Sequence, residues 1–130
     1  MAQCFIPSWV SCLDESMSPW TSRWTCPGWM YVPRKPHPQG NGYHTIACEE
    51  SGILYGIELV EGRTRPPEKP REKYVEEFGK TASLLLRLSE SIFNTGKLIV
   101  LDSGFCVLKA IIALKKKGIY SSALIKKRRY

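Results

Sequence analysis

Apolar residues in the second half of the chain recur first at helical and then at strand-like spacing. From about Glu72 to Phe93 they return every three or four positions, which predicts an amphipathic helix. Leu98–Leu101 is apolar at every position, which is typical of a strand buried on both faces. A second helix is expected over Phe105–Lys117, ended by a glycine. A last strand is expected over Ile119–Ile125.

The first half of the chain favours strands and ordered loops. Tyr43–Glu49 and Ile53–Val60 predict the two strands of a hairpin, joined by a turn at Glu50-Ser51-Gly52. Before this hairpin, frequent prolines and all four tryptophans are typical of short strands and loops packed by aromatic side chains. The proline-rich stretch after the hairpin marks another loop.

The order of these elements predicts the fold class. A first strand is followed by a hairpin, a helix, a strand, a helix and a strand. This order favours an α/β fold in which helices pack on a mixed sheet. In the ribonuclease H arrangement of this order, the first strand lies beside the strand after the first helix and runs parallel to it. The length of 130 residues predicts a single domain.

The chain contains only two aspartates, and each ends a short apolar run, Asp14 in WVSCLDESM and Asp102 in LIVLDSGF. In the predicted topology they would end neighbouring parallel strands, about 4.8 Å apart. Carboxylates at such an edge can hold a hard divalent cation such as Mg²⁺. An aspartate followed by serine or glycine is also ordinary turn chemistry, so a structural role stays open.

The net charge of +7 is distributed unevenly, because residues 109–130 carry eight basic residues and no acidic one. Such an end favours binding to phosphates, although a solvated tail has the same composition. The sequence has no apolar run of 18 residues and no signal peptide, so we expect an intracellular protein without a membrane partner. Five widely spaced cysteines, together with His37 and His44, predict neither a disulfide framework nor a zinc site.

Four segments resemble the catalytic domain of piggyBac-type transposases, and together they cover about residues 8–130. The stretch CLDESMSPWTSRWTCPGWMYVPRKPHPQGNGYHT carries an Asp-Glu pair, then Arg23, a Pro-x-Lys-Pro stretch and Gly40. VLDSGFCVLKAI is similar to the second aspartate segment of the family, and SSALIKKRR to the next strand with its basic exit. The chain departs from the pattern at Tyr43-His44, where some members carry a lysine.

The resemblance implies a ribonuclease H-like core that cuts and joins DNA with Mg²⁺ held by three aspartates. Asp14 corresponds to the first and Asp102 to the second, so both receive catalytic and metal-binding roles. Contacts to nucleic acid are implied for Arg23, Lys35, Lys126, Lys127, Arg128 and Arg129.

The third aspartate of the family would lie beyond Tyr130. We therefore expect residues 1–130 to be a truncated catalytic domain, from its first to its fifth strand, with a weak or incomplete Mg²⁺ site. The principal hypothesis is a transposase-derived fragment that is catalytically inactive alone. The alternatives are a small domesticated DNA-binding module that uses the basic C-terminal segment, and a competent nuclease or transposase subunit completed in trans or by an unusual third ligand. The partners we expect are DNA and either a second copy of the chain or a fuller transposase chain. A DNA partner predicts nuclear localisation.

Overall fold

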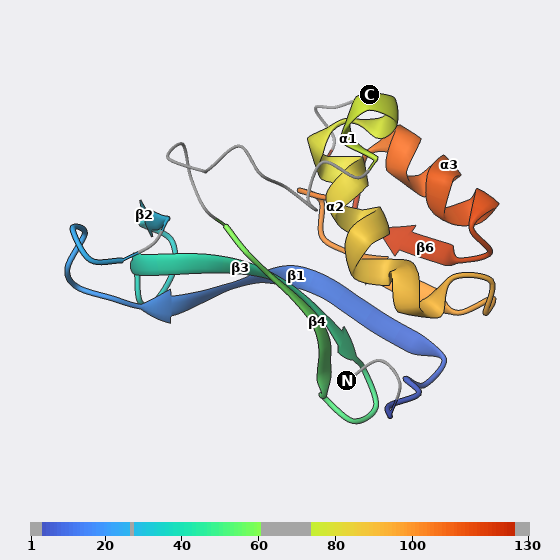
Figure 1. The fold of residues 1–130 in the computed structure, drawn as a ribbon, viewed down its shortest axis with the longest axis horizontal. Helices are drawn as coiled ribbons and strands as arrows, with labels where there is room; N and C mark the ends of the chain where they lie inside the picture. The colour runs from blue at the N-terminus through green and yellow to red at the C-terminus, as the bar shows by residue number, and fades with distance from the viewer. Residues whose placement is uncertain (1–3, 27, 61–73, 127–130) are drawn as a thin grey trace.

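Six strands form one mixed sheet in the computed structural model, which describes residues 4–26, 28–60 and 74–126 (Figure 1). The strands are β1 Val10–Pro19, β2 Trp29–Tyr31, β3 Gln39–Cys48, β4 Leu54–Leu59, β5 Leu98–Leu101 and β6 Tyr120–Ala123. The helices are α1 Val75–Phe78, α2 Lys80–Ser89, the 3₁₀ helix η2 Glu90–Ile92 and α3 Leu108–Lys116.

The order of the strands in the sheet is β2-β3-β1-β5-β6, and β4 also pairs with β3. β1 and β3 are antiparallel, whereas β1–β5 and β5–β6 are parallel pairs. β2 and β4 pair with successive parts of β3, β2 with Gln39–Asn41 and β4 with Tyr43–Ala47. The predicted ribonuclease H-like α/β arrangement is confirmed, including the parallel neighbours β1 and β5.

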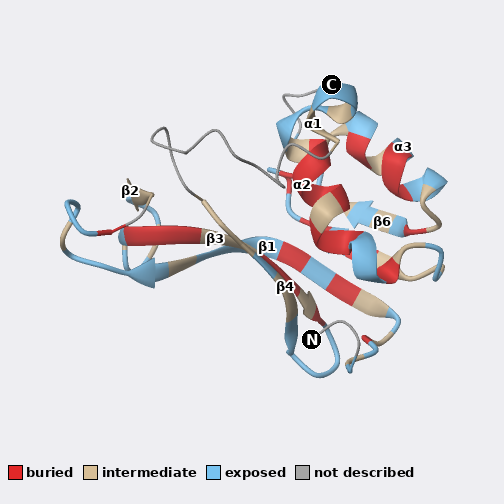
Figure 2. Cartoon of the chain, in the orientation of Figure 1, coloured by how far each residue is buried: buried red, intermediate tan, exposed pale blue. Residues whose placement is uncertain are grey.

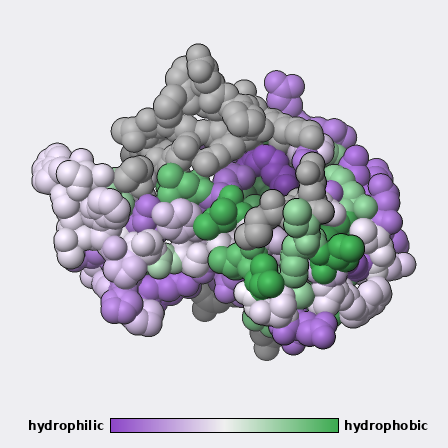
Figure 3. Space-filling model, turned by 60° about the horizontal axis from the view of Figure 1, so that its bottom comes forward, coloured by the Kyte–Doolittle hydropathy of each residue, from purple (hydrophilic) through white to green (hydrophobic). Residues whose placement is uncertain are grey.

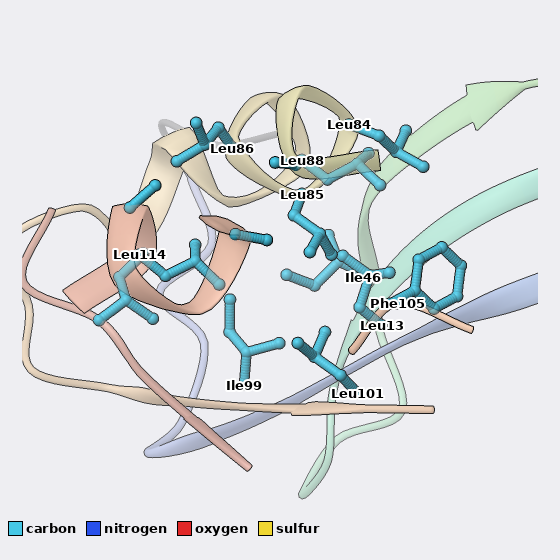
Figure 4. Close-up of a cluster of buried hydrophobic side chains, with 14 of the residues drawn as sticks. Leu13, Ile46, Leu84, Leu85, Leu86, Leu88, Ile99, Leu101, Phe105 and Leu114 are labelled. Carbon is cyan, nitrogen blue, oxygen red and sulfur yellow. The ribbon is translucent and has the colours of Figure 1, made fainter. Parts of the chain in front are cut away.

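The hydrophobic core lies between the sheet and helices α2 and α3 (Figure 4). Leu13 on β1, Ile46 on β3 and Ile99 on β5 are at most 1% exposed, and all three point toward the helices. Because side chains alternate across a strand, the next positions point away from the helices. Cys12 and Val100 on that opposite face are exposed. Figure 2 shows this alternation of buried and exposed positions along β1.

The structure corrects the predicted long helix. Within its described part the helix is divided at Gly79, whose φ of +83° and ψ of 173° are not helical. Gly79 N–H donates to the Val75 carbonyl and ends α1, and α2 begins at the next residue. The first two residues of the predicted helix, 72 and 73, lie outside the described residues. None of the described helices is long and apolar enough to cross a membrane.

The first strand is also longer than the hydrophobic pattern indicates. Asp14 was expected to end it, but β1 continues to Pro19 because β3 pairs with it along this whole length. β4 pairs with β3 as far as Tyr43, which faces Ser16 of β1, and beyond Ser16 only β1, β3 and β2 project from the helical body (Figure 1). We call residues 16–42 the wing.

Candidate functional site

The register of β1 against β5 brings the two aspartates together. Leu13 pairs with Leu101 at the last position of this parallel ladder. Asp14 is the next residue of β1, and Asp102 is the first residue after β5. Adjacent strands lie about 4.8 Å apart, so the two side chains start from neighbouring positions. Leu13 and Leu101 point into the core, and the alternation of side chains along β1 directs Asp14 to the helix-free face. Both aspartates are exposed.

Backbone groups of β1 are left unpaired by β5 next to Asp14. The Leu98 N–H group of β5 donates to the carbonyl of Trp9, the residue before β1, at 3.0 Å. Along β1, the backbone groups of every second residue counted from Trp9 therefore point toward β5. Glu15 belongs to this series, but β5 has already ended at Leu101. Glu15 N–H instead donates to Asp14 Oδ1 at 2.7 Å, and Lys35 Nζ donates to the Glu15 carbonyl at 3.4 Å. The Asp14 carboxylate and the Lys35 ammonium thus share the free edge of β1.

A tight turn favours the ionised form of Asp102. Phe105 N–H donates to the Asp102 carbonyl at 3.0 Å and closes the turn. The pKa of the Asp102 carboxyl lies below its ordinary value, chiefly because Ser103 N–H donates to the carboxylate. Partial desolvation opposes this effect, while Gly104 N–H, the Ser103 hydroxyl and the positive charge of Lys126 add to it.

The described residues supply two carboxylates to this site and no third ligand. They contain no group of three or more His, Cys, Asp or Glu side chains that could hold a metal ion. Glu15 follows Asp14 directly and points to the opposite face, where its Oε1 lies 3.7 Å from His44 Nε2. Asp14 and Asp102 therefore fit one hard cation that keeps most of its water ligands.

His44 contacts the turn that carries Asp102. Its ring packs edge-on against Phe105, with the ring centroids 5.7 Å apart. Burial lowers the pKa of His44 below its ordinary value of 6.5, although the negative charges of Glu15 and Glu58 partly oppose the shift. His44 thus supports this turn mainly as a neutral ring.

The predicted nucleic-acid contacts divide into two places. Lys35 lies at the free edge of β1, and Lys126 is close enough to Asp102 for its charge to act on that carboxyl. Arg23 lies instead in the wing, where its guanidinium carbon is 4.8 Å from the centre of the Trp24 ring. Lys127, Arg128 and Arg129 lie outside the described residues.

The sequence prediction missed the groups that position the two carboxylates. These are the Ser103 and Gly104 N–H groups and the Glu15 backbone. The Asp-Ser-Gly sequence after an apolar strand could have indicated the two N–H groups, because a turn of this kind directs backbone N–H groups at the aspartate side chain. The hydrogen bond from Lys35 to Glu15, 20 residues away in the sequence, left no local signal.

A mixed sheet in this order, with two aspartates side by side at its centre, defines the class as a ribonuclease H-like core. The chain belongs to the Transposase IS4 family, whose model matches residues 1–130. No curated protein matches the sequence.

The fold is similar to that of a piggyBac transposase determined by cryo-electron microscopy as a synaptic complex with hairpin DNA. The TM-score is 0.76 at 17% sequence identity, and the match covers 95% of this chain and 24% of that protein. The chain thus spans about a quarter of the length of that transposase. Together with the family match, this confirms the resemblance to piggyBac-type transposases.

Proposed function

We propose that this chain is the part of a transposase catalytic domain that supplies the first two metal-binding carboxylates, and that the 130-residue chain alone does not cut DNA. The observation that carries the proposal is the register of β1 and β5, which makes Asp14 and Asp102 direct neighbours. Family membership supports the same conclusion, because it relates the chain to transposases along its whole length.

The two carboxylates would hold a single Mg²⁺ ion. A bound divalent cation supplies charge stabilisation to a phosphodiester and lowers the pKa of bound water. The residues of the chain itself prepare the site for the cation and the phosphate. The N–H groups of its turn favour the ionised form of Asp102, and Lys35 and Lys126 would supply positive charge to an approaching phosphate.

Inactivity of the isolated chain follows from the number of ligands. Phosphoryl-transfer sites of this kind hold two metal ions, one at the attacking and one at the leaving oxygen. Two carboxylates can hold one Mg²⁺ only weakly, because this ion gives up its waters reluctantly. The sequence contains no third aspartate, and Glu15 faces the other side of the sheet.

The test is a titration with Mn²⁺, followed by the line broadening of backbone amide signals. In the parent chain we expect broadening around residues 14 and 102 at millimolar Mn²⁺, and no nicking of plasmid DNA. Asp14→Asn and Asp102→Asn should each abolish the local broadening, whereas Glu50→Gln, a change to an exposed carboxylate in the β3–β4 turn, should not. Broadening that survives both aspartate variants would refute the site. Nicking that is lost in Asp102→Ala would refute the proposed inactivity.

The second candidate function is a DNA-binding module that uses the basic C-terminal segment. Its support is Lys126, whose charge reaches Asp102 and which begins the run Lys126–Arg129. If this run contacts phosphates, binding to duplex DNA is independent of sequence and falls steeply with salt. Replacing all four residues with serine should flatten the log–log salt slope by up to about 3–4 units.

Lys115→Ser, Lys116→Ser and Lys117→Ser, combined in one variant, provide the control for this test. These lysines form the basic end of α3 and its cap, where their charge also stabilises the helix. An unchanged slope in the Lys126–Arg129 variant, or an equal loss in the α3 variant, would reduce the exit run to a solvated tail.

A further inference from the structure

The wing presents exposed aromatic side chains where its strands end. The fractional exposures are 85% for Trp24, 55% for Tyr31 and 42% for Trp20. These three are the exposed large hydrophobic residues of the described wing, and none of them is aliphatic. On the face drawn in Figure 3, the strongly hydrophobic residues gather over the centre and right of the molecule, whereas the left end, with the wing, is white to purple.

The loop that carries Trp24 is held in place from within. Trp20 Nε1–H donates to Thr25 Oγ1 at 3.1 Å, and Thr25 N–H donates to the Ser22 carbonyl at 3.4 Å. The Arg23 guanidinium lies over one face of the Trp24 ring. With the side chain 85% exposed, the other face of the indole is open to a flat partner. A preformed loop lowers the entropy cost of binding such a partner.

The charge of the wing is positive throughout. Residues 16–42 contain Arg23, Arg34 and Lys35 and no aspartate or glutamate, although the whole chain has twelve acidic residues. Cations beside exposed aromatic rings match the chemistry of single-stranded nucleic acid, in which phosphates alternate with bases that can stack. A membrane or a protein groove would instead favour exposed aliphatic side chains beside the aromatic ones.

We propose that the wing binds an unpaired strand of DNA, with one base stacked on the open face of Trp24 and the neighbouring phosphate on Arg23. The inference rests on the proposed nucleic-acid function and specifies the form of DNA that the wing binds. β1 connects the wing to the aspartate pair. Trp20 lies six positions after Asp14, which corresponds to about 20 Å of extended strand. A strand bound at Trp24 can therefore pass along the edge that carries Asp14 and Lys35.

The test compares three labelled ligands by fluorescence anisotropy at low salt: a twelve-nucleotide oligo-dT, an abasic strand of the same length and a duplex. The parent should bind oligo-dT more tightly than the abasic strand. Trp24→Ala should weaken binding to oligo-dT by about 5- to 150-fold and leave the abasic strand and the duplex unchanged. Trp24→Phe, which keeps a ring, should retain most of the affinity.

Trp9→Ala is the matched control, because Trp9 is 60% exposed but lies at the other end of β1. It should change the affinity for oligo-dT by less than twofold. Arg23→Gln should reduce the log–log salt slope on the single strand by about 0.7.

Three results would overturn the proposal: unchanged binding of oligo-dT by Trp24→Ala, an equal loss on the abasic strand, or binding of the parent to anionic vesicles but not to oligo-dT. A parent that binds the duplex and the abasic strand as well as oligo-dT would refute this inference alone. A parent that binds no nucleic acid at all would also refute DNA binding as a function of the isolated chain.

Discussion

Replacing Gly40 with alanine should disrupt the pairing of β1 with β3 inside the wing while the core stays folded. Gly40 has a φ of +155°, and a Cβ built on it would lie 1.9 Å from the Ser18 carbonyl oxygen. That oxygen belongs to the backbone of the paired strand, so β1 and β3 must separate to admit a methyl group. We expect Gly40→Ala to cost about 3–5 kcal/mol of folding free energy, because the strained φ angle and the steric overlap both contribute.

Gly52→Ala provides the control, because Gly52 also has a positive φ of +69° but no atom lies within 4 Å of its built Cβ. Gly52→Ala should lower the free energy of unfolding only through the strained φ angle, by about 1–2 kcal/mol. The difference between the two variants therefore measures the overlap at Ser18.

Hydrogen exchange distinguishes loss of the wing from global unfolding. In Gly40→Ala, the amides of Trp20 and Val32, which bond to the Gln39 and Pro38 carbonyls, should lose protection. The amide of Leu98, bonded to the Trp9 carbonyl between β5 and β1, should keep it. Equal protection of the wing in the Gly40 and Gly52 variants would refute the reasoning.

Two further predictions concern the body of the fold. The Arg87 and Glu58 side chains form two hydrogen bonds of 2.8 and 3.1 Å between α2 and β4, and both are only 15% exposed. Arg87→Met alone should therefore lower the free energy of unfolding by about 3 kcal/mol, and Glu58→Leu added to it should restore part of this loss in urea denaturation. His44 has a lowered pKa in the folded state, so the unfolded chain takes up its proton first and stability should fall as the pH drops below 6.5. His44→Gln should flatten this dependence between pH 7 and 5 in thermal melts, and an unchanged slope would show that His44 is not its source.

The sequence was sufficient to predict that the two strands before the aspartates are parallel neighbours. Each aspartate follows a short apolar run, and the ribonuclease H arrangement of the predicted elements puts those two strands side by side. The strands pair as far as Leu13 and Leu101, so Asp14 and Asp102 follow at neighbouring positions of the chain. Local pattern and topology together thus determine this part of the site.

What the sequence did not predict depends on partners distant along the chain. β1 continues past Asp14 through polar residues because β3 pairs with it as far as Pro19. The break at Gly79 was missed because the apolar spacing continues across it, although the glycine itself was a signal. Hydrophobic periodicity reports which face is buried, but it does not report where a strand keeps its partner or a helix changes direction.

The length of β1 relative to β5 explains the position of the candidate site. Up to Leu13, β1 lies between two strands, and beyond it β1 has a partner on one side only. The change from two neighbours to one leaves unpaired backbone groups at Glu15, and Lys35 and the Asp14 carboxylate bond there. The same continuous strand then carries the chain into the cationic wing. Asp14 thus lies on the strand that leads into the wing, whereas Asp102 follows β5 and Trp24 lies in the loop after β1. Asp14→Asn should therefore leave binding of single-stranded DNA at Trp24 unchanged, whereas Gly40→Ala should weaken it without affecting Mn²⁺ broadening at residue 102.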